Sequence, residues 1–280
     1  MCLPAFRNRH KMFESGVVSL AALLLTSIGT AAAQGDYQVV SVANAGTITG
    51  TVKWSGPQPR VLTFPLNKDV AVCDPESRKR VDLERLVIGP NGGVANTVVF
   101  LKNISSGKPM DLPEPRRSLN QKHCRYEPHI LLVPENAELE MTSSDRVLHT
   151  VHMEGAATYN LPFPFPDRPV SRPMPHAGVA TLKCNGGHLW MNAVVMVADN
   201  PYYTVTDDEG KFELRGVPPG EYEIVAWHEG WHVVGQQASF DVSTSKKVDR
   251  PIFSEPKTSQ KEVSVGPNGT AVVNFVIAEK

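Results

Sequence analysis

The chain has 280 residues, of which 28 are Lys or Arg and 29 are Asp or Glu, so its formal net charge is −1. This balance argues against nucleic-acid binding, which needs a basic surface to neutralise phosphates. Hydrophobic residues make up 41% of the chain and charged residues 20%, as in folded globular proteins. The 23 Pro and 21 Gly favour short strands and loops over long helices. The length predicts about two domains.

The first 33 residues have the features of a secretory signal peptide. Three Lys or Arg residues within 7–11 precede an apolar run that begins at Gly16. The run is shorter than the ~20 residues of a membrane-spanning helix, and it ends in three alanines at 31–33. We therefore expect residues 1–33 to be removed, leaving a secreted or periplasmic protein with no membrane span. An uncleaved membrane anchor is the alternative.

The remaining sequence predicts many short strands separated by turns. This pattern is typical of packed antiparallel sheets, so we predict an all-β protein. Residues 66–86 leave room for a turn or two of helix, whereas 109–118, 162–175 and 244–262 are expected to be irregular. Strands are expected at residues 46–54, 96–102, 129–133, 138–142, 147–153, 179–184, 192–198, 204–206, 211–214, 222–227, 240–242 and 271–277.

Three of the four cysteines remain after the predicted signal peptide, which contains Cys2. Three cysteines in an oxidising compartment cannot all pair within one chain. The third is left for a disulfide with another chain, a free thiol or a metal. Cys184 has the neighbours that suit a metal, so we expect Cys73 to pair with Cys124.

The motif Cys184-x3-His188-x2-Met191 carries the clearest chemistry in the sequence. A thiolate, an imidazole and a thioether lie within eight residues, between two predicted strands. Soft sulfur ligands favour Cu(I), and a trigonal site of two His and one Cys with a weak axial Met supports electron transfer. The site needs a second histidine, for which the best candidate is His149, in a strand that follows a turn.

The order His149, Cys184, His188 and Met191 before a last strand resembles the cupredoxin (blue-copper) family, over about residues 126–198. The resemblance implies a Greek-key β-sandwich that holds one copper ion with these four residues and transfers single electrons. It also implies that the edge of His188 is exposed as the electron exit. Members commonly have Asn after the first ligand His, where this chain has Thr150, so the arrangement around the ligands is left open.

Other ligands and other outcomes compete with this reading. A buried Cys near His and Met also occurs in ordinary cores, so a metal-free sandwich is one alternative. Zinc is another, although Met is a poor zinc ligand. His152 points to the opposite face of its strand from His149, His129 is expected to be structural, and His176 to lie in a turn.

The segment 206–224, TDDEGKFELRGVPPGEYEI, resembles carboxypeptidase regulatory-like domains, whose fold is a transthyretin-like (prealbumin-like) β-sandwich. The resemblance divides the chain into a cupredoxin-like domain with extra N-terminal strands, 34–199, and a carboxypeptidase regulatory-like domain, 200–280. The strand at 46–52 also suits the second domain, so the first unit is either inserted into it or shares a sheet with it.

We therefore expect a copper-binding electron-transfer protein with a redox protein as partner, and not an enzyme, because no catalytic motif is found. The Phe- and Pro-rich segment 162–175 is either an apolar rim for that partner or a packed loop. The alternatives are a non-redox copper carrier and a carbohydrate- or envelope-binding module. His228 and His232 are expected to be solvated. Four rings either stack on sugars or fill the core: Tyr202, Tyr203, Trp227 and Trp231.

Overall fold

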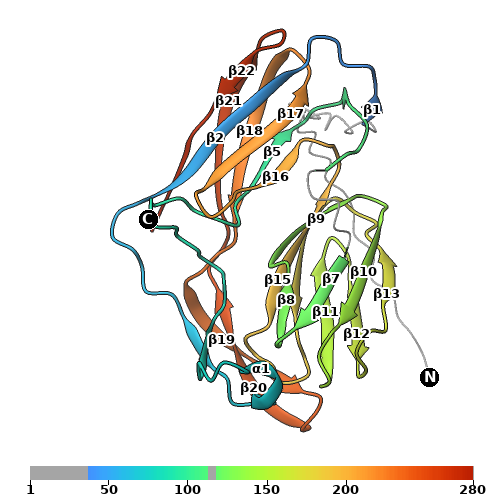
Figure 1. The fold of residues 1–280 in the computed structure, drawn as a ribbon, viewed down its shortest axis with the longest axis vertical. Helices are drawn as coiled ribbons and strands as arrows, with labels where there is room; N and C mark the ends of the chain where they lie inside the picture. The colour runs from blue at the N-terminus through green and yellow to red at the C-terminus, as the bar shows by residue number, and fades with distance from the viewer. Residues whose placement is uncertain (1–36, 113–117, 280) are drawn as a thin grey trace, which may run out of the picture. The chain divides into compact units, whose positions relative to one another are not determined.

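The computed structural model describes residues 37–112 and 118–279, which belong to one compact unit, Gln34–Lys280. The predicted signal peptide lies outside the described residues. The described part is almost entirely β-structure, which confirms the all-β class (Figure 1). No helix in these residues is long and apolar enough to cross a membrane. The helix α1 (Val70–Cys73) is one turn long and lies in the region expected to hold a turn or two.

The first sandwich packs a four-stranded sheet, in the order β13-β10-β7-β8, against a five-stranded sheet, in the order β12-β11-β14-β15-β9. Alternation builds this core: in β10, Leu139 and Met141 are buried while Glu138 and Glu140 are exposed. The strands of the sandwich are β7 (Ser118–Lys122), β8 (Arg125–Glu127), β9 (Ile130–Pro134), β10 (Glu138–Ser143), β11 (His149–Gly155), β12 (Tyr159–Phe163), β13 (Val170–Pro173), β14 (Gly178–Lys183) and β15 (Asn192–Ala198).

The second sandwich has a sheet in the order β16-β5-β18-β21 and another in the order β17-β2-β22, with β23 also paired to β2. Its core is a separate cluster that includes Ile48, Phe212 and Phe275. Its strands are β2 (Gly46–Ser55), β5 (Val98–Lys102), β16 (Tyr203–Val205), β17 (Lys211–Val217), β18 (Gly220–His228), β21 (Lys257–Val265), β22 (Thr270–Val272) and β23 (Phe275–Ala278).

The strand pairing does not follow the predicted domain boundary at residue 199. Strands β2 and β5 precede the first sandwich in sequence, yet they pair with β17 and β18 of the second. The first sandwich is thus inserted between β5 and β16, which is one of the two arrangements left open by the sequence. A third cluster of buried residues, including Val98, Leu132 and Trp227, joins strands from both sandwiches.

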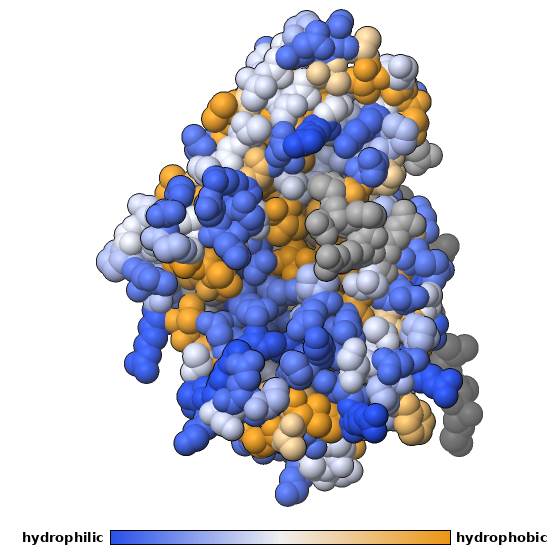
Figure 2. Space-filling model, viewed as in Figure 1, coloured by the Kyte–Doolittle hydropathy of each residue, from blue (hydrophilic) through white to orange (hydrophobic). Residues whose placement is uncertain are grey.

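Four further short strands and one long hairpin complete the described part. The short strands pair as β1 (Gln38–Val39) with β6 (Ser106–Gly107), and as β3 (Thr63–Pro65) with β4 (Arg80–Asp82). The hairpin joins β19 (Val233–Asp241) to β20 (Lys246–Phe253). Figure 2 shows that hydrophilic residues cover most of one face of the molecule, between smaller hydrophobic patches.

Two segments expected to be irregular contain strands. Residues 244–262 include all of β20 and the first part of β21, and 162–175 include the end of β12 and all of β13. The hairpin strands expose most residues on both faces, so they lack the apolar alternation that marks a half-buried strand.

The pairing of β2 with both β22 and β23 depends on Gly50. A Cβ at Gly50 would lie 1.7 Å from the carbonyl oxygen of Val273, between these two strands. We expect Gly50→Ala to lower the free energy of unfolding by about 1–3 kcal/mol, because the strands must move apart. The control is Gly266→Ala, since a Cβ there meets nothing within 4 Å. Equal losses in urea denaturation would contradict the packing argument.

Candidate metal centre

Three of the four predicted ligands meet at one end of the five-stranded sheet. His149 begins β11, Cys184 directly follows β14, and His188 lies in the loop between β14 and β15. Because β11 and β14 pair antiparallel, with His152 opposite Lys183, the start of β11 lies beside the end of β14. One ligand atom from each of His149, Cys184 and His188 lies within 4.8 Å of the other two. All three residues are 0% exposed.

The two imidazole rings turn the same nitrogen toward each other. His149 Nδ1 lies 3.2 Å from His188 Nδ1, which is 3.8 Å from Cys184 Sγ. The outer nitrogens face carboxylates: His149 Nε2 lies 2.8 Å from Asp145, and His188 Nε2 lies 2.9 Å from Asp69. A carboxylate accepts a hydrogen bond from Nε2–H, so in a neutral ring with this tautomer Nδ1 is the nitrogen that carries the lone pair. Two nitrogen donors and one sulfur therefore converge on one point.

The thiol of Cys184 is readily ionised despite its burial. Burial raises the pKa of a thiol, but hydrogen bonds with His149 and His188, together with their charge, lower the pKa of Cys184 to about 5. Burial likewise lowers the pKa of a histidine, but the hydrogen bonds with Asp145 and Cys184 raise the pKa of His149 to about 9. Between these values the metal-free site holds a thiolate beside an imidazolium.

Thr150 links the two ligand-bearing segments at the position where Asn is common in cupredoxins. Its backbone N–H donates to Cys184 Sγ at 3.4 Å, and the N–H of Gly186 donates to the same sulfur at 3.3 Å. The hydroxyl of Thr150 accepts a 2.6 Å hydrogen bond from the N–H of Asn185. The start of β11 is therefore tied to the loop that follows Cys184.

Two adjacent glycines let the ligand loop pass close to its surroundings. A Cβ at Gly186 would lie 2.9 Å from the carbonyl oxygen of Leu148. Gly187 has a φ of +91°, and a Cβ there would lie 2.4 Å from a carboxylate oxygen of Asp241. Other residues would strain this loop or push it away from its neighbours.

Met191, the fourth predicted ligand, is 1% exposed and belongs to the same core cluster as Cys184. Its backbone N–H donates to the carbonyl of His188 at 3.0 Å, which closes a turn of the loop. This turn places Met191 at the end of the ligand loop, immediately before β15. Its role as an axial ligand stays a prediction.

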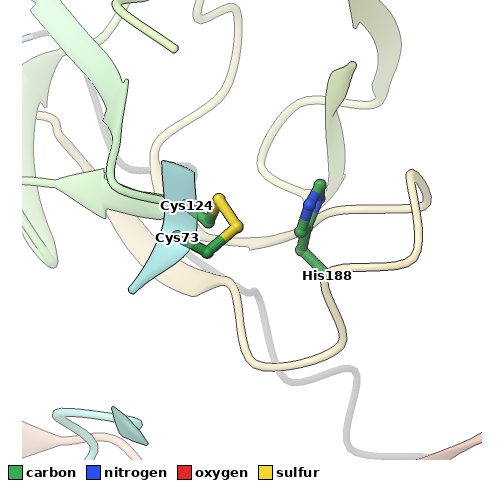
Figure 3. A group of neighbouring side chains, drawn as sticks. All are labelled: Cys73, Cys124 and His188. Carbon is green, nitrogen blue, oxygen red and sulfur yellow. A yellow bond between two sulfur atoms is a disulfide. The ribbon is translucent and has the colours of Figure 1, made fainter. Parts of the chain in front are cut away.

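The expectation of an exposed His188 edge is wrong. His188 is 0% exposed, because residues 66–74, which contain α1, cover it and place Asp69 on its outer nitrogen. The same segment contains Cys73, which forms a disulfide with Cys124. Figure 3 shows the ring of His188 beside this disulfide. The ring has no free edge on the surface.

The other histidines lie outside this cluster. His152 Nε2 lies 2.8 Å from Glu154 on the outer face of the sheet, and His176 is exposed in a bend. His129 is buried against Glu229, which also pairs with Arg85 at 2.7 Å. This arrangement gives His129 a structural role, as expected.

The expectation that His228 is solvated is wrong. His228 is fully buried because it ends β18 in the core, and its Nδ1 lies 2.8 Å from the carbonyl oxygen of Glu229. Burial lowers the pKa of His228, so the ring is neutral. The side chain of His232 is 36% exposed.

The four rings considered for sugar stacking fill the interior. Their exposed fractions are at most 9%, so they present no open stacking surface in this structure: Tyr202, Tyr203, Trp227 and Trp231.

Asp69 and Asp145 are the site residues that the sequence analysis missed. Asp145 lies four residues before His149 in the preceding turn, which is a signal that could have been used. Asp69 lies 119 residues from His188, and nothing in its local sequence links the two.

Comparisons with known proteins match separate parts of the chain. The family model for the carboxypeptidase regulatory-like domain matches residues 185–278, which confirms that resemblance. The matched range includes β15 to β23 but leaves out β2 and β5, which pair with strands within it. A search of curated proteins finds no match.

Solved structures similar to part of the chain include three copper-protein structures. A purple cupredoxin from Nitrosopumilus maritimus is 19% identical over 29% of this chain and 98% of its own, with a TM-score of 0.26. A reduced mutant of amicyanin is 20% identical over 31% of this chain and 87% of its own, with a TM-score of 0.28. A Cu-containing nitrite reductase from Thermus scotoductus is 14% identical over 29% of this chain, with a TM-score of 0.27. This chain covers only 22% of that reductase.

We expect the thiolate of metal-free protein to persist well below the usual thiol range. Ultraviolet thiolate absorption should fall as the pH is lowered through about 5, the pKa of Cys184. An unperturbed cysteine would instead lose this absorption near pH ~8.5. The absorption of the full-length Cys184→Ser variant is subtracted as the background, because this variant retains Cys2 and every tyrosine. A difference signal that titrates near ~8.5 would contradict the thiolate–imidazolium pair.

Proposed function

We propose that this chain holds one copper ion with His149, Cys184 and His188 and acts as a one-electron carrier. The observation that supports it most strongly is the convergence of two imidazole nitrogens and one Sγ within 4.8 Å at a fully buried position. Two imidazoles and one thiolate are the strong ligands of blue-copper electron-transfer sites. Bound copper would supply a reversible change between Cu(I) and Cu(II).

The protonation state of Cys184 favours metal binding, whereas the imidazolium of His149 must lose its Nδ1 proton when a metal binds. A metal ligand must be a thiolate or a neutral imidazole nitrogen, and the pKa of Cys184 at about 5 makes its thiolate the prevalent form at neutral pH. Asp145 and Asp69 hold the outer nitrogens and so keep both Nδ1 atoms directed at the sulfur. The N–H groups of Thr150 and Gly186 stabilise the sulfur charge. The chain therefore preorganises its donors.

This arrangement favours copper over the alternatives. Structural zinc sites have four strong nitrogen, oxygen or sulfur ligands, whereas Met191 as a fourth ligand would be a thioether. A metal-free core gains nothing from a buried thiolate, since burial of a charge costs free energy. Complete burial of the three ligands also fits a retained ion better than one that is handed on by a carrier.

The proposed partner is another redox protein, and the proposed role involves no substrate turnover. His149 pairs in register with Phe163, which is buried, and Phe165, two residues further on, is 67% exposed. With the edge of His188 covered, this side of the site offers an exposed ring near a ligand. We place the docking surface there.

The test is the visible absorption spectrum after addition of Cu(II) to the wild-type and Cys184→Ser proteins. The wild type should show an intense thiolate-to-copper charge-transfer band, which the variant cannot produce because it lacks the sulfur. His152→Ala is the matched control, since this histidine lies on the same strand but pairs with Glu154 on the outer face. Absence of the band from wild type, or its presence in Cys184→Ser, would refute the proposal.

The Met191→Leu variant tests separately whether Met191 is a copper ligand. Leu has nearly the volume of Met, so the fold should be kept. Loss of the electron-donating thioether destabilises Cu(II) more than Cu(I), so the reduction potential measured by protein-film voltammetry should rise. An unchanged potential and spectrum would exclude Met191 as a ligand without affecting the assignment of the other three.

A further inference from the structure

The disulfide Cys73–Cys124 lies directly against the proposed copper site. Both of its sulfurs and a ring nitrogen of His188 lie within 4.8 Å of one another, as Figure 3 illustrates. Cys124 Sγ also lies within 4.8 Å of a ring nitrogen of His149. Cys184 Sγ lies 3.8 Å from Nδ1 of the same His188 ring. Three cysteine sulfurs therefore surround one buried imidazole.

A cavity reaches one end of the disulfide. Cys73 lines a cavity of about 290 Å³ whose wall also contains Arg78, Arg125 and Glu127. Cys73 is 5% exposed, whereas Cys124 is 0% exposed. A thiol in this cavity would therefore lie nearer to Cys73 than to Cys124, which does not line it.

We propose that reduction of Cys73–Cys124 creates a second position for a soft metal ion, held by the two thiolates and His188 and selective for Cu(I). Two thiolates and an imidazole form a donor set that prefers Cu(I) to hard divalent cations. The inference goes beyond the proposed function: this position shares His188 with the proposed copper site but does not use the sulfur of Cys184.

The reduction is an ordinary thiol–disulfide exchange with a dithiol. A thiolate of the dithiol attacks Sγ of Cys73, and Cys124 leaves as a thiolate. The second thiol of the reagent then displaces Cys73, so the reagent ends as a disulfide. The protein gains two electrons and two protons as its pair of thiols. Binding of Cu(I) releases those two protons and involves no change in the oxidation state of the metal.

Both cysteines are anchored by contacts other than the disulfide. The N–H of Cys124 donates to Asp145 at 2.8 Å, and its carbonyl accepts from the indole N–H of Trp190 at 2.9 Å. The N–H of Cys73 donates to the carbonyl of Asp69 at 2.9 Å, and Asp69 is itself bound to His188. These contacts hold both thiols near His188 after the disulfide opens.

The experiment compares Cu(I) binding by the full-length protein before and after reduction. Disulfide-bonded and dithiol-reduced samples are desalted and titrated anaerobically with Cu(I) against the chelator bicinchoninate. On reduction, the Cu(I) affinity or capacity of the wild type should rise by about tenfold or more. This size is expected because removing even a group that only hydrogen-bonds to a metal ligand lowers metal affinity by about tenfold or more. The Cys73→Ser/Cys124→Ser variant, which retains Cys2 and Cys184, should show no such gain.

Equal binding by the reduced wild type and this double variant would overturn the proposal. Unfolding on reduction, seen in tryptophan fluorescence and in circular dichroism, would overturn it as well. If the double variant fails to fold, X-ray absorption of Cu(I)-loaded, reduced Cys184→Ser decides. Sulfur ligands are expected there, and a spectrum without sulfur would overturn the proposal.

The two proposals fail separately. Cys184→Ser should lose the charge-transfer band but keep reduction-dependent Cu(I) binding. A wild type with reduction-dependent binding and no such band would refute only the electron-transfer function. A wild type with the band and no effect of reduction would refute only the second metal position.

Discussion

The antiparallel pairing of β11 with β14 is the constraint on which the candidate site depends. Its register sets His152 opposite Lys183, so the residues just beyond the pairing, His149 and Cys184, come together. The thiolate and the imidazolium then stabilise each other in an interior that would otherwise disfavour both charges. A slip of one residue would turn every side chain to the opposite face and separate the pair.

The rest of the site is held from outside the first sandwich. Asp69 comes from the segment before β4, and the hairpin of β19 and β20 supports the ligand loop through Arg250, which donates to the carbonyl of Cys184. Lys68 joins these two supports through an ion pair with Asp241 at 3.0 Å. The ligands therefore depend on segments that flank the inserted sandwich on both sides of the sequence.

Local chemistry was predictable from the sequence, and distant contacts were predictable only where residue types that pair or bind a metal marked them, as for Cys73 and Cys124. The motif of Cys184, His188 and Met191 is short, and the strand at His149 has clear apolar neighbours, so both could be identified. Asp69 could not, because its link to His188 spans 119 residues. Strand β2 was found by its alternation, but no local pattern shows that it pairs with β17. The polar hairpin of β19 and β20 lacked the alternation that would have revealed it.

The insertion between β5 and β16 has a consequence for the order of folding. These two strands pair antiparallel, with Phe100 opposite Tyr203, and their rings stack at 4.7 Å. The ribosome releases Phe100 long before Tyr203, so β5 must wait for its neighbour until the intervening chain has emerged. If that chain has already collapsed into its own sandwich, its ends are close and the entropy of closing the long loop is small. In that case the inserted sandwich would hold β5 and β16 near each other and so promote their pairing during synthesis.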